Sequence, residues 1–437
     1  MNLKSLSLSF LLVFLSVSSY ANKHYLVFIH GIASDEGTFA SGQVALPNYL
    51  NSIQNEVQYV STSFGYPTGK DQYDTFDFAK MLEDFMAKLP LEKNDKFSFI
   101  CHSQGGLVAM NWLRFNYSND GLGIFKSKEI IENQMDKMAT FGTPYFGTQI
   151  VRVPLYLKKL KDFIFGKKEL RDMMFGSQML TNLRDTFFYD ENFKKFISHI
   201  KLLNVSGNFQ LAKTSSLSFM LEDDLAVPVP SASLNFDHYI DRSLPDPFSP
   251  NKKLKHFEHH SVRTFTLARP HISLTKRGLV KVPKECITDF SCDHEGFQVM
   301  SHFFSDNMDG LNIDFYEPES FYVHLRLHIP KTSRYTILKD KDDYDITLSP
   351  VLGDNRLIAG DPFFFNVETK APQNDDKGHV DIILAGKLKH EQQRNVILSV
   401  RVRGAYLKRE IPITVKRGRP VVVDLNLYGL SDYYPRF

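Results

Sequence analysis

Long apolar runs are scarce in this chain of 437 residues. The one candidate extends from about Leu6 to Val17, and small residues follow it up to Ala21. This run is shorter than the ~20 apolar residues that a membrane-spanning helix needs. We therefore expect residues 1–21 to be a secretory signal peptide that is cleaved after Ala21, with a short membrane anchor as the alternative. The mature protein is then expected to be secreted or periplasmic.

An excess of charge of either sign is also absent. The formal net charge is +2, and 23% of the residues are charged. No broad basic field is available to follow a phosphate backbone, so nucleic acid is not an expected partner. With 43% hydrophobic residues, the composition is that of a globular protein, and the length allows roughly two or three domains.

Cysteine is rare, with three residues in the chain. Cys286 and Cys292 lie close together in the sequence and are expected to form a disulfide in an oxidising compartment. Cys101 lies within an apolar segment, which favours a small buried residue over a reactive thiol. No pattern has the spacing of a zinc site, and the acidic segment 306–314 lacks the EF-hand spacing of a calcium loop. We expect neither a metal nor a cofactor.

The N-terminal part of the mature chain, residues 22–282, alternates short apolar runs with amphipathic segments. This alternation predicts an α/β fold with a mostly parallel sheet that is covered by helices. Apolar residues between Phe78 and Leu89 fall on one face and predict a helix that ends before Pro90. The expected strands are residues 25–30, 57–63, 97–101, 137–141, 200–207 and 262–268.

The pattern changes after residue 282. Residues 283–310 are expected to form a polar connector. Residues 311–437 contain segments with apolar side chains at every second position, which predicts a C-terminal all-β domain similar to a β-sandwich. In one of these segments His324 and His328 face away from the apolar residues, and we interpret them as surface residues.

The segment CHSQGG, residues 101–106, is the strongest indication of chemistry. Apolar residues that predict a strand precede it, and a helix-compatible segment follows it. This context is typical of a nucleophile elbow, in which Ser103 is held in a strained turn and Gly105 and Gly106 avoid collisions with the strand behind. Cys101 stands where the G-x-S-x-G pattern has its first glycine. The alternative is a serine that only caps the helix.

A serine nucleophile needs a base, and it needs donors for the oxyanion that its attack creates. The segment IHGIAS, residues 29–34, follows the first predicted strand. It is expected to bring the backbone N–H of Ile32 beside that of Gln104, and these two amides are the expected oxyanion hole. His30 and His102 are interpreted as structural residues that orient the turns.

These segments, together with three others, resemble the lipase branch of the α/β-hydrolase superfamily, which includes relatives of triacylglycerol lipases and GPI-inositol deacylases. The sequence departs from the family pattern at Cys101 and at Tyr145, where relatives commonly have a histidine. The resemblance implies an α/β-hydrolase fold with a helical cap and a Ser-Asp-His triad. It covers residues 22–280 and rests on HGIAS (30–34), CHSQGG (101–106), FGTPYFGT (141–148), FGSQMLTNL (175–183) and DDLAVPVPSASL (223–234).

The resemblance implies that the acid of the triad lies in the turn DLAVP, at Asp224, with Asp223 as the alternative. For the base, His271 follows the last predicted strand, where the fold presents this residue, and it begins an H-x-x-L ending like that of the family. His260 precedes that strand and is the alternative. The order Ser103, Asp224, His271 is the one expected for this fold.

An insertion at about residues 149–198 is placed where lipase-like enzymes have a cap. Its apolar residues are expected to line an acyl pocket or to contact a lipid surface, and its lysines to meet anionic headgroups. Packing of these helices on the protein body is the alternative. The apolar residues are Leu155, Leu160, Phe163, Ile164, Phe165, Met173, Met174 and Phe175, and the lysines are Lys158, Lys159, Lys161, Lys167 and Lys168.

Together these features predict a serine hydrolase that cleaves carboxylic esters through an acyl-enzyme, with acyl lipids as the expected substrates. A phospholipid-dependent acyltransferase would use the same residues and differ only in the acceptor. A binding protein with an inert hydrolase fold, which attaches through the β-sandwich, is the alternative from another class. The expected partners are an acyl-ester lipid, a lipid surface that is contacted peripherally, and an unidentified ligand of the C-terminal domain.

Overall fold

The computed structural model describes most of the chain from residue 22 to residue 426. The described residues are 22–32, 34–118, 123–148, 166–208, 222, 224, 226–241, 255–259, 262–269, 271, 287–288, 290, 294–328, 344–351, 363–366, 379–388, 391–402 and 408–426. The expected signal peptide and both cysteines of the expected disulfide, Cys286 and Cys292, lie outside these residues. Within them, no helix has the length and the apolar character needed to cross a membrane.

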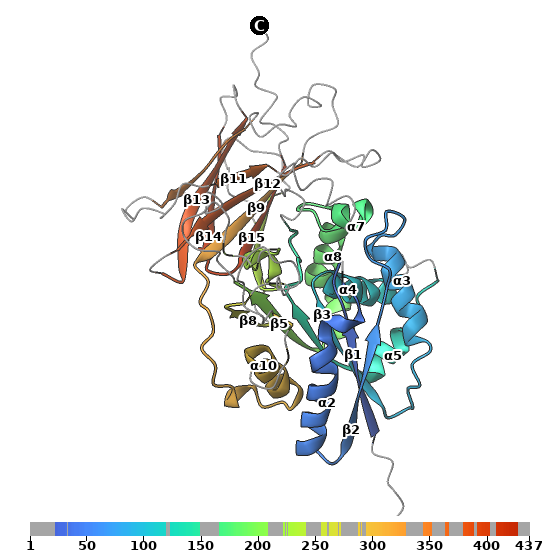
Figure 1. Ribbon diagram of the computed structural model, residues 1–437. Coiled ribbons are helices and arrows are strands. Elements are labelled where there is room, and N and C mark those ends of the chain that lie inside the picture. The colour runs from blue at the N-terminus through green and yellow to red at the C-terminus, as the bar shows by residue number, and fades with distance from the viewer. Residues whose placement is uncertain are drawn as a thin grey trace, which may run out of the picture.

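Six parallel strands form the sheet of the N-terminal domain (Figure 1), and this confirms the predicted α/β fold. Their order across the sheet is β2-β1-β3-β4-β5-β8. Each strand overlaps one of the apolar runs, as expected for strands that are covered on both faces. The strands are β1 (Asn22–Ile29), β2 (Val57–Phe64), β3 (Lys96–His102), β4 (Met135–Phe141), β5 (Lys201–Gly207) and β8 (Arg263–Leu267).

Helices cover both faces of this sheet. Side chains of β1 alternate between two clusters, because successive residues of a strand point to opposite faces: Val27 packs in one cluster and Phe28 in the other. The first cluster includes α3 (Thr75–Met86), α4 (Gln104–Tyr117), α5 (Lys128–Gln134), α8 (Gln178–Tyr189) and α9 (Glu191–Ile197). The second includes α2 (Ala40–Ile53), which follows the 3₁₀ turn η1 (Glu36–Phe39), and α10 (Glu295–Phe304).

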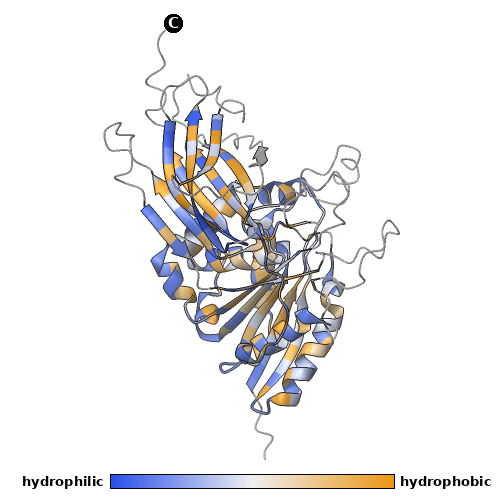
Figure 2. Cartoon of the chain, turned by 90° about the vertical axis from the view of Figure 1, so that its left-hand side faces the viewer, coloured by the Kyte–Doolittle hydropathy of each residue, from blue (hydrophilic) through white to orange (hydrophobic). Residues whose placement is uncertain are grey.

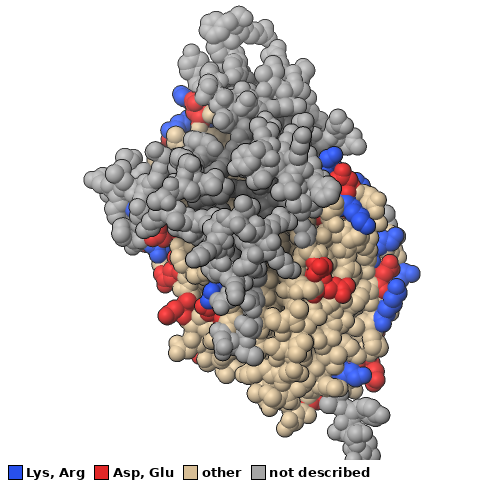
Figure 3. Space-filling view, in the orientation of Figure 1, with Lys and Arg blue, Asp and Glu red and all other residues tan. Residues whose placement is uncertain are grey.

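Helix α2 has no charged residue and leaves three large apolar side chains exposed, those of Val44, Tyr49 and Ile53. Figure 3 shows few charged side chains on the lower part of the face that carries this helix.

The expected polar connector at 283–310 is wrong, because helix α10 belongs to the core of the N-terminal domain. Phe297, Val299 and Met300 are buried in the cluster under the sheet, and so is Phe290. The C-terminal end of the helix is held by Lys137 of β4, whose Nζ donates to the carbonyls of Phe303 and Phe304. The 3₁₀ turn η7 (Met308–Gly310) follows.

Two further sheets pack face to face beyond the N-terminal domain, which confirms the predicted β domain (Figure 1). Figure 2 shows apolar residues recurring along the strands of both layers. The six-stranded sheet has the order β11-β12-β9-β15-β6-β7, and the three-stranded sheet has the order β10-β13-β14. The C-terminal strands are β9 (Ser320–His328), β10 (Tyr344–Pro350), β11 (Phe363–Asn366), β12 (His379–Lys387), β13 (Gln393–Val402), β14 (Lys408–Lys416) and β15 (Pro420–Asn426).

The expected division of the chain at residues 282 and 311 is also wrong at the strands β6 (Phe236–Asp241) and β7 (Lys255–His259). Both lie within the predicted hydrolase range, yet they extend the six-stranded sheet of the β domain. Strand β6 pairs in parallel with β15, with Asp237 opposite Val421. Segments far apart in the sequence therefore build one sheet, which a search for a single boundary could not reveal.

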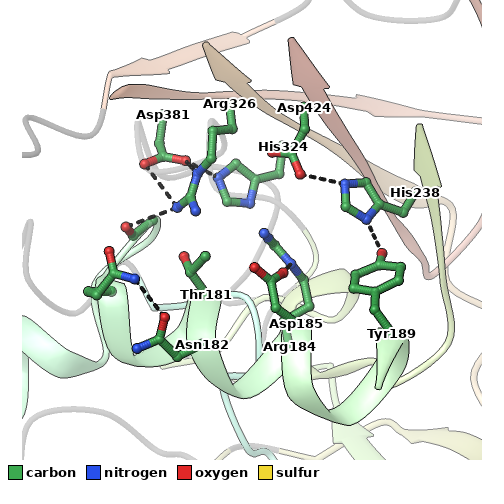
Figure 4. A network of polar contacts seen from close by, with 12 residues as sticks. Thr181, Asn182, Arg184, Asp185, Tyr189, His238, His324, Arg326, Asp381 and Asp424 are labelled. Atoms are coloured by element: carbon green, nitrogen blue, oxygen red, sulfur yellow. Dashed lines mark hydrogen bonds and ion pairs between the residues drawn. The ribbon is translucent and has the colours of Figure 1, made fainter. Parts of the chain in front are cut away.

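The interpretation of His324 as a surface residue is wrong, because the polar face of β9 packs against α8 and not against water. His324 Nε2 and Arg326 Nε lie 2.7 and 2.8 Å from the same oxygen of Asp381 on β12. The neighbouring pair of His238 and Asp424 is 2.6 Å apart. Figure 4 shows how these side chains point toward α8, and all of them are buried.

The described part of the predicted cap packs on the protein body, and this agrees with the alternative to a lipid-contacting cap. Met173 and Phe175, close to α7 (Lys167–Asp172), are buried. Lys168 is exposed and donates to the carbonyl of Gln72. Residues 149–165, which contain the other predicted lipid contacts except Met174 and Lys167, lie outside the described residues.

Candidate active site

Ser103 lies in a sharp turn between β3 and α4. Its φ and ψ are 52° and −124°, a conformation that costs free energy for any residue with a side chain. The turn is anchored by a hydrogen bond of 2.8 Å from the Ser103 N–H to the carbonyl of Phe141 on β4. A Cβ on Gly105 would collide with the carbonyl of His30, and one on Gly106 would collide with Thr143. Both positions therefore require glycine.

Cys101 fills the place of the first glycine of the usual pattern. It lies on β3, is fully buried and forms no disulfide. Burial raises the pKa of its thiol well above the ordinary value, so the thiol stays protonated. The residue therefore acts as a small apolar side chain, as expected from its apolar segment.

Asp224 and His271 are brought together from two different loops. The Nδ1 atom of His271 lies 2.7 Å from Oδ2 of Asp224, and the His271 N–H donates to the Asp224 carbonyl at 2.8 Å. The other carboxylate oxygen of Asp224 accepts from the N–H groups of Ala226 and Val227. Each end of the carboxylate thus has a partner. The alternatives Asp223 and His260 lie outside the described residues.

This pair lies beside the turn of Ser103. The ring of His271 is 4.4 Å from the ring of His102, the residue that precedes Ser103. A Cβ on Gly142, at the end of β4, would lie 2.7 Å from His271 Nδ1 and 2.9 Å from Asp224 Oδ2. Burial and the neighbouring His271 lower the pKa of His102 well below its ordinary value, so His102 stays neutral and acts as a packing surface for His271.

The two predicted oxyanion amides belong to the turn of Ser103 and to the loop after β1. Gln104 is the first residue of α4, so its N–H has no intrahelical partner. Ile32 belongs to the loop after β1, and its N–H donates no hydrogen bond within the described part of the chain. In the same loop, a Cβ on Gly31 would lie 2.7 Å from the Cβ of Ser103. The loop therefore passes close to the serine.

The loop with Ile32 is held by His30 and by Tyr66, which sequence reasoning missed. The two rings stack at 4.4 Å, and the N–H of Tyr66 donates to Nε2 of His30 at 3.2 Å. His30 Nδ1 in turn donates to the Gly31 carbonyl, and burial lowers the pKa of His30. The ring is thereby kept neutral with its proton on Nδ1, in the structural role expected for it. Tyr66 stands in no motif that could have indicated its contact.

The site is almost closed to solvent. Ser103 is 4% exposed and His271 is 5% exposed, while Asp224 has no exposed surface. No group of three or more His, Cys, Asp or Glu residues within the described ranges is arranged to hold a metal ion. The arrangement itself can support attack by the serine hydroxyl, with an imidazole oriented by a carboxylate and with amides available for an oxyanion.

A comparison with protein families matches the segment that contains Ser103. Residues 19–203 match the family described as "Putative serine esterase (DUF676)". This range includes Ser103 and both predicted oxyanion residues, and it ends before Asp224 and His271. A comparison with curated proteins gave no match.

Solved structures show the same fold. Phospholipase PlaB from Legionella pneumophila is 14% identical, with a TM-score of 0.61 over 93% of each chain. The same phospholipase in complex with thio-NAD gives 12% identity and a TM-score of 0.59, over 92% of this chain and 93% of that chain. The alignment with the metagenomic carboxyl esterase MGS0156 covers 49% of this chain and 60% of the esterase, at 15% identity. Its TM-score of 0.28 is too low to compare the folds.

The likeness to the phospholipase extends over both domains and shows a shared architecture, while the family match concerns residues 19–203, which contain Ser103. The chain therefore has a lipase-like α/β-hydrolase fold with a C-terminal β domain, and its residues 19–203 are similar to the serine esterase family.

Proposed function

We propose that this protein hydrolyses carboxylic esters with Ser103 as the nucleophile, His271 as the base and Asp224 as the acid. The observation that carries the proposal is the geometry around the elbow. A strained serine stands beside a histidine whose Nδ1 is 2.7 Å from a buried carboxylate. Strain of this kind is costly and persists where the surrounding structure enforces it, as it does at many functional sites.

The reaction follows from the roles of these groups. His271, whose Nδ1–H donates a hydrogen bond to Asp224, takes the proton of the Ser103 hydroxyl on Nε2 as the oxygen attacks the ester carbonyl. The N–H groups of Ile32 and Gln104 donate to the oxyanion. Collapse of the tetrahedral intermediate expels the alcohol, which receives the proton from His271. Water then attacks the acyl-enzyme by the same route and releases the carboxylic acid.

Acyl lipids are the substrate class that we favour. The fold is shared with a protein named a phospholipase, over 93% of both chains. We also propose that residues 1–21 are a signal peptide, since their apolar run is too short to span a bilayer, and that the mature protein acts outside the cytoplasm.

The test is hydrolysis of p-nitrophenyl esters, from short to long acyl chains, by residues 22–437. We expect Ser103→Ala, His271→Ala and Asp224→Asn to lower kcat by about 10⁴-fold or more, while His260→Ala keeps the activity. A preference for long chains supports a lipid substrate. A folded protein that cleaves no ester, and whose Ser103 is not labelled by a fluorophosphonate, contradicts the proposal and points to a binding function.

A further inference from the structure

Glu169 of α7 connects the described part of the cap to the catalytic turn. Its side chain is fully buried. One carboxylate oxygen, Oε1, accepts a hydrogen bond of 2.9 Å from the N–H of Gly69, and the other, Oε2, accepts one of 3.3 Å from Nε2 of Gln104. Gln104 follows Ser103 and supplies one amide of the proposed oxyanion hole. A buried carboxylate therefore contacts the side chain of an oxyanion-hole residue.

The opposite end of the Gln104 side chain faces the loop with the second amide. The hydroxyl of Tyr66 lies 3.5 Å from Oε1 of Gln104 and donates to the carbonyl of His30 at 2.7 Å. His30 lies two residues before Ile32. The amide group of Gln104 is thus held between Glu169 on one side and Tyr66 with His30 on the other, and all of these side chains are buried.

We propose that Glu169 is a positioning residue of the oxyanion hole, which fixes the side-chain amide of Gln104 in a single orientation. An ionised carboxylate can only accept hydrogen bonds, so it selects the NH₂ end of the amide and directs the carbonyl end to Tyr66. A protonated carboxyl can also donate, and it permits the reversed amide. This inference rests on the proposed function, because the hole serves the reaction of Ser103.

Glu169 changes its charge close to neutral pH. Burial raises its pKa to about 7, and Asp172 on the same helix adds to this effect, while the hydrogen bonds from Gly69 and Gln104 oppose it. Tyr66 stays neutral, because burial raises its pKa well above the ordinary value. The other charged residues on α7 and on the facing loop are Lys70, Asp71, Lys167, Lys168 and Arg171, which are exposed, and Asp74, which is half-buried.

The test compares the parent with Glu169→Gln in the hydrolysis of the best ester. A glutamine directs an NH₂ group either at Gln104 or at the N–H of Gly69, so the oxyanion donors remain but are held less firmly. We expect kcat to fall by about 10-fold, less than the 10²–10³-fold cost of deleting a donor, with KM changed by less than about 2-fold. A defect of substrate binding would raise KM instead.

The pH profile separates positioning from a structural role. In the parent, protonation of the base abolishes the reaction, and protonation of Glu169 lowers its rate by about the same 10-fold as the glutamine, so log(kcat/KM) should fall more steeply than a slope of one over about one pH unit on the acid side. In Glu169→Gln only the protonation of the base remains, and the slope should not exceed about one. The parent profile alone tests the inference even where the variant fails to fold, since a slope of one in the parent contradicts it.

Asp172→Asn is the matched control. Asp172 is a buried carboxylate on the same helix, and it accepts from the N–H of Thr75 at 3.0 Å without contacting Gln104. We expect this variant to lower Tm and to move the steep part of the profile to lower pH, because the Asp172 charge that raises the pKa of Glu169 is removed, but to keep the parent kcat and slope. The inference is overturned where Glu169→Gln keeps the parent kcat and slope, or where Asp172→Asn changes them equally. A parent that neither hydrolyses esters nor reacts with a fluorophosphonate overturns the proposed function, and this inference with it.

Discussion

His24 is a buried histidine near the start of β1 whose protonation is opposed by the fold. Its Nε2 lies 2.7 Å from the hydroxyl of Ser98, and its ring stacks on Tyr59 at 5.0 Å. Burial lowers its pKa from 6.5 to about 3, and the cations of Lys137 and Lys96 add to the effect. Between about pH 6.5 and pH 3, His24 is therefore neutral in the folded protein, while in the unfolded chain it carries a proton.

The stability that depends on neutral His24 should be lost in acid. The unfolded chain binds this proton below about pH 6.5, whereas the folded protein does so only near pH 3. The free energy of unfolding therefore falls as the pH falls through this window. We expect His24→Phe, which keeps the ring, to flatten the fall of Tm between pH 7 and pH 4 in thermal unfolding. Parallel curves for parent and variant would contradict this assignment.

At the candidate active site, the sequence indicates residues that stand in short motifs and misses those that depend on distant contacts. The Asp224 and His271 side chains, predicted from a turn and from a strand end, lie in contact. Glu169 stands in the segment KKEL, whose composition resembles a solvated helix face. Its burial depends on a loop 100 residues earlier in the chain, at Gly69. No local pattern reports such a contact.

Among the elements, the strands of the parallel sheet are predicted correctly, and the strands that join the sheet of the other domain are not. The six strands of the parallel sheet each overlap a short segment that is rich in apolar residues. Strands β6 and β7 contain many polar residues, such as His238 and Glu258, and so show no apolar run. Their place in a sheet depends on β15, from a distant part of the chain. Helix α10 is short and follows a polar segment, so the sequence pattern does not predict that one of its faces is buried.

Helix α10 offers a test at the scale of one element. The ammonium group of Lys137 is buried, lies 3.1 Å from each of the carbonyls of Phe303 and Phe304, and lies 3.0 Å from Asp306. Lys137→Met removes the partner of the last carbonyls of the helix. We expect a loss of about 1–3 kcal/mol in the free energy of unfolding, measured with urea.

Lys201→Met is the control for this helix. Lys201 pairs with the same carboxylate of Asp306 at 2.7 Å, but its side chain is 56% exposed. An exposed ion pair contributes at most about 1 kcal/mol. If both lysine variants lose the same free energy of unfolding, the contacts of Lys137 with the end of helix α10 do not stabilise the protein.

For the whole molecule, the polar layer between the two domains decides how firmly they hold together. Asp381 accepts hydrogen bonds from both His324 and Arg326, and Arg326 also donates to the carbonyl of Gly176, which lies before α8 (Figure 4). Asp381→Ala leaves a buried guanidinium without its anion, and we expect a loss of about 3–5 kcal/mol. Urea unfolding followed by circular dichroism measures this loss.

Asp345→Ala provides the comparison within the β domain. Asp345 pairs with Arg401 in an exposed position, where the side chains are 35% and 49% exposed. This variant should lose at most about 1 kcal/mol. Equal losses in the two aspartate variants would show that the layer between the domains adds no more than a surface pair.

Strand β15, the last described strand, lies inside its sheet between β9 and β6. The ribosome releases the N-terminal part of the chain first. The hairpin of β6 and β7 therefore cannot pair with β15 until residues 420–426 have been synthesised. Glu222, two residues before Asp224, accepts from the N–H groups of Glu319 and Ser320 at the start of β9. The loop that contains Asp224 therefore gains these contacts only after β9 has been synthesised. During synthesis, Ser103 is thus present long before the residues around it are assembled, and a half-made chain does not yet hold the loop of Asp224 in its final place.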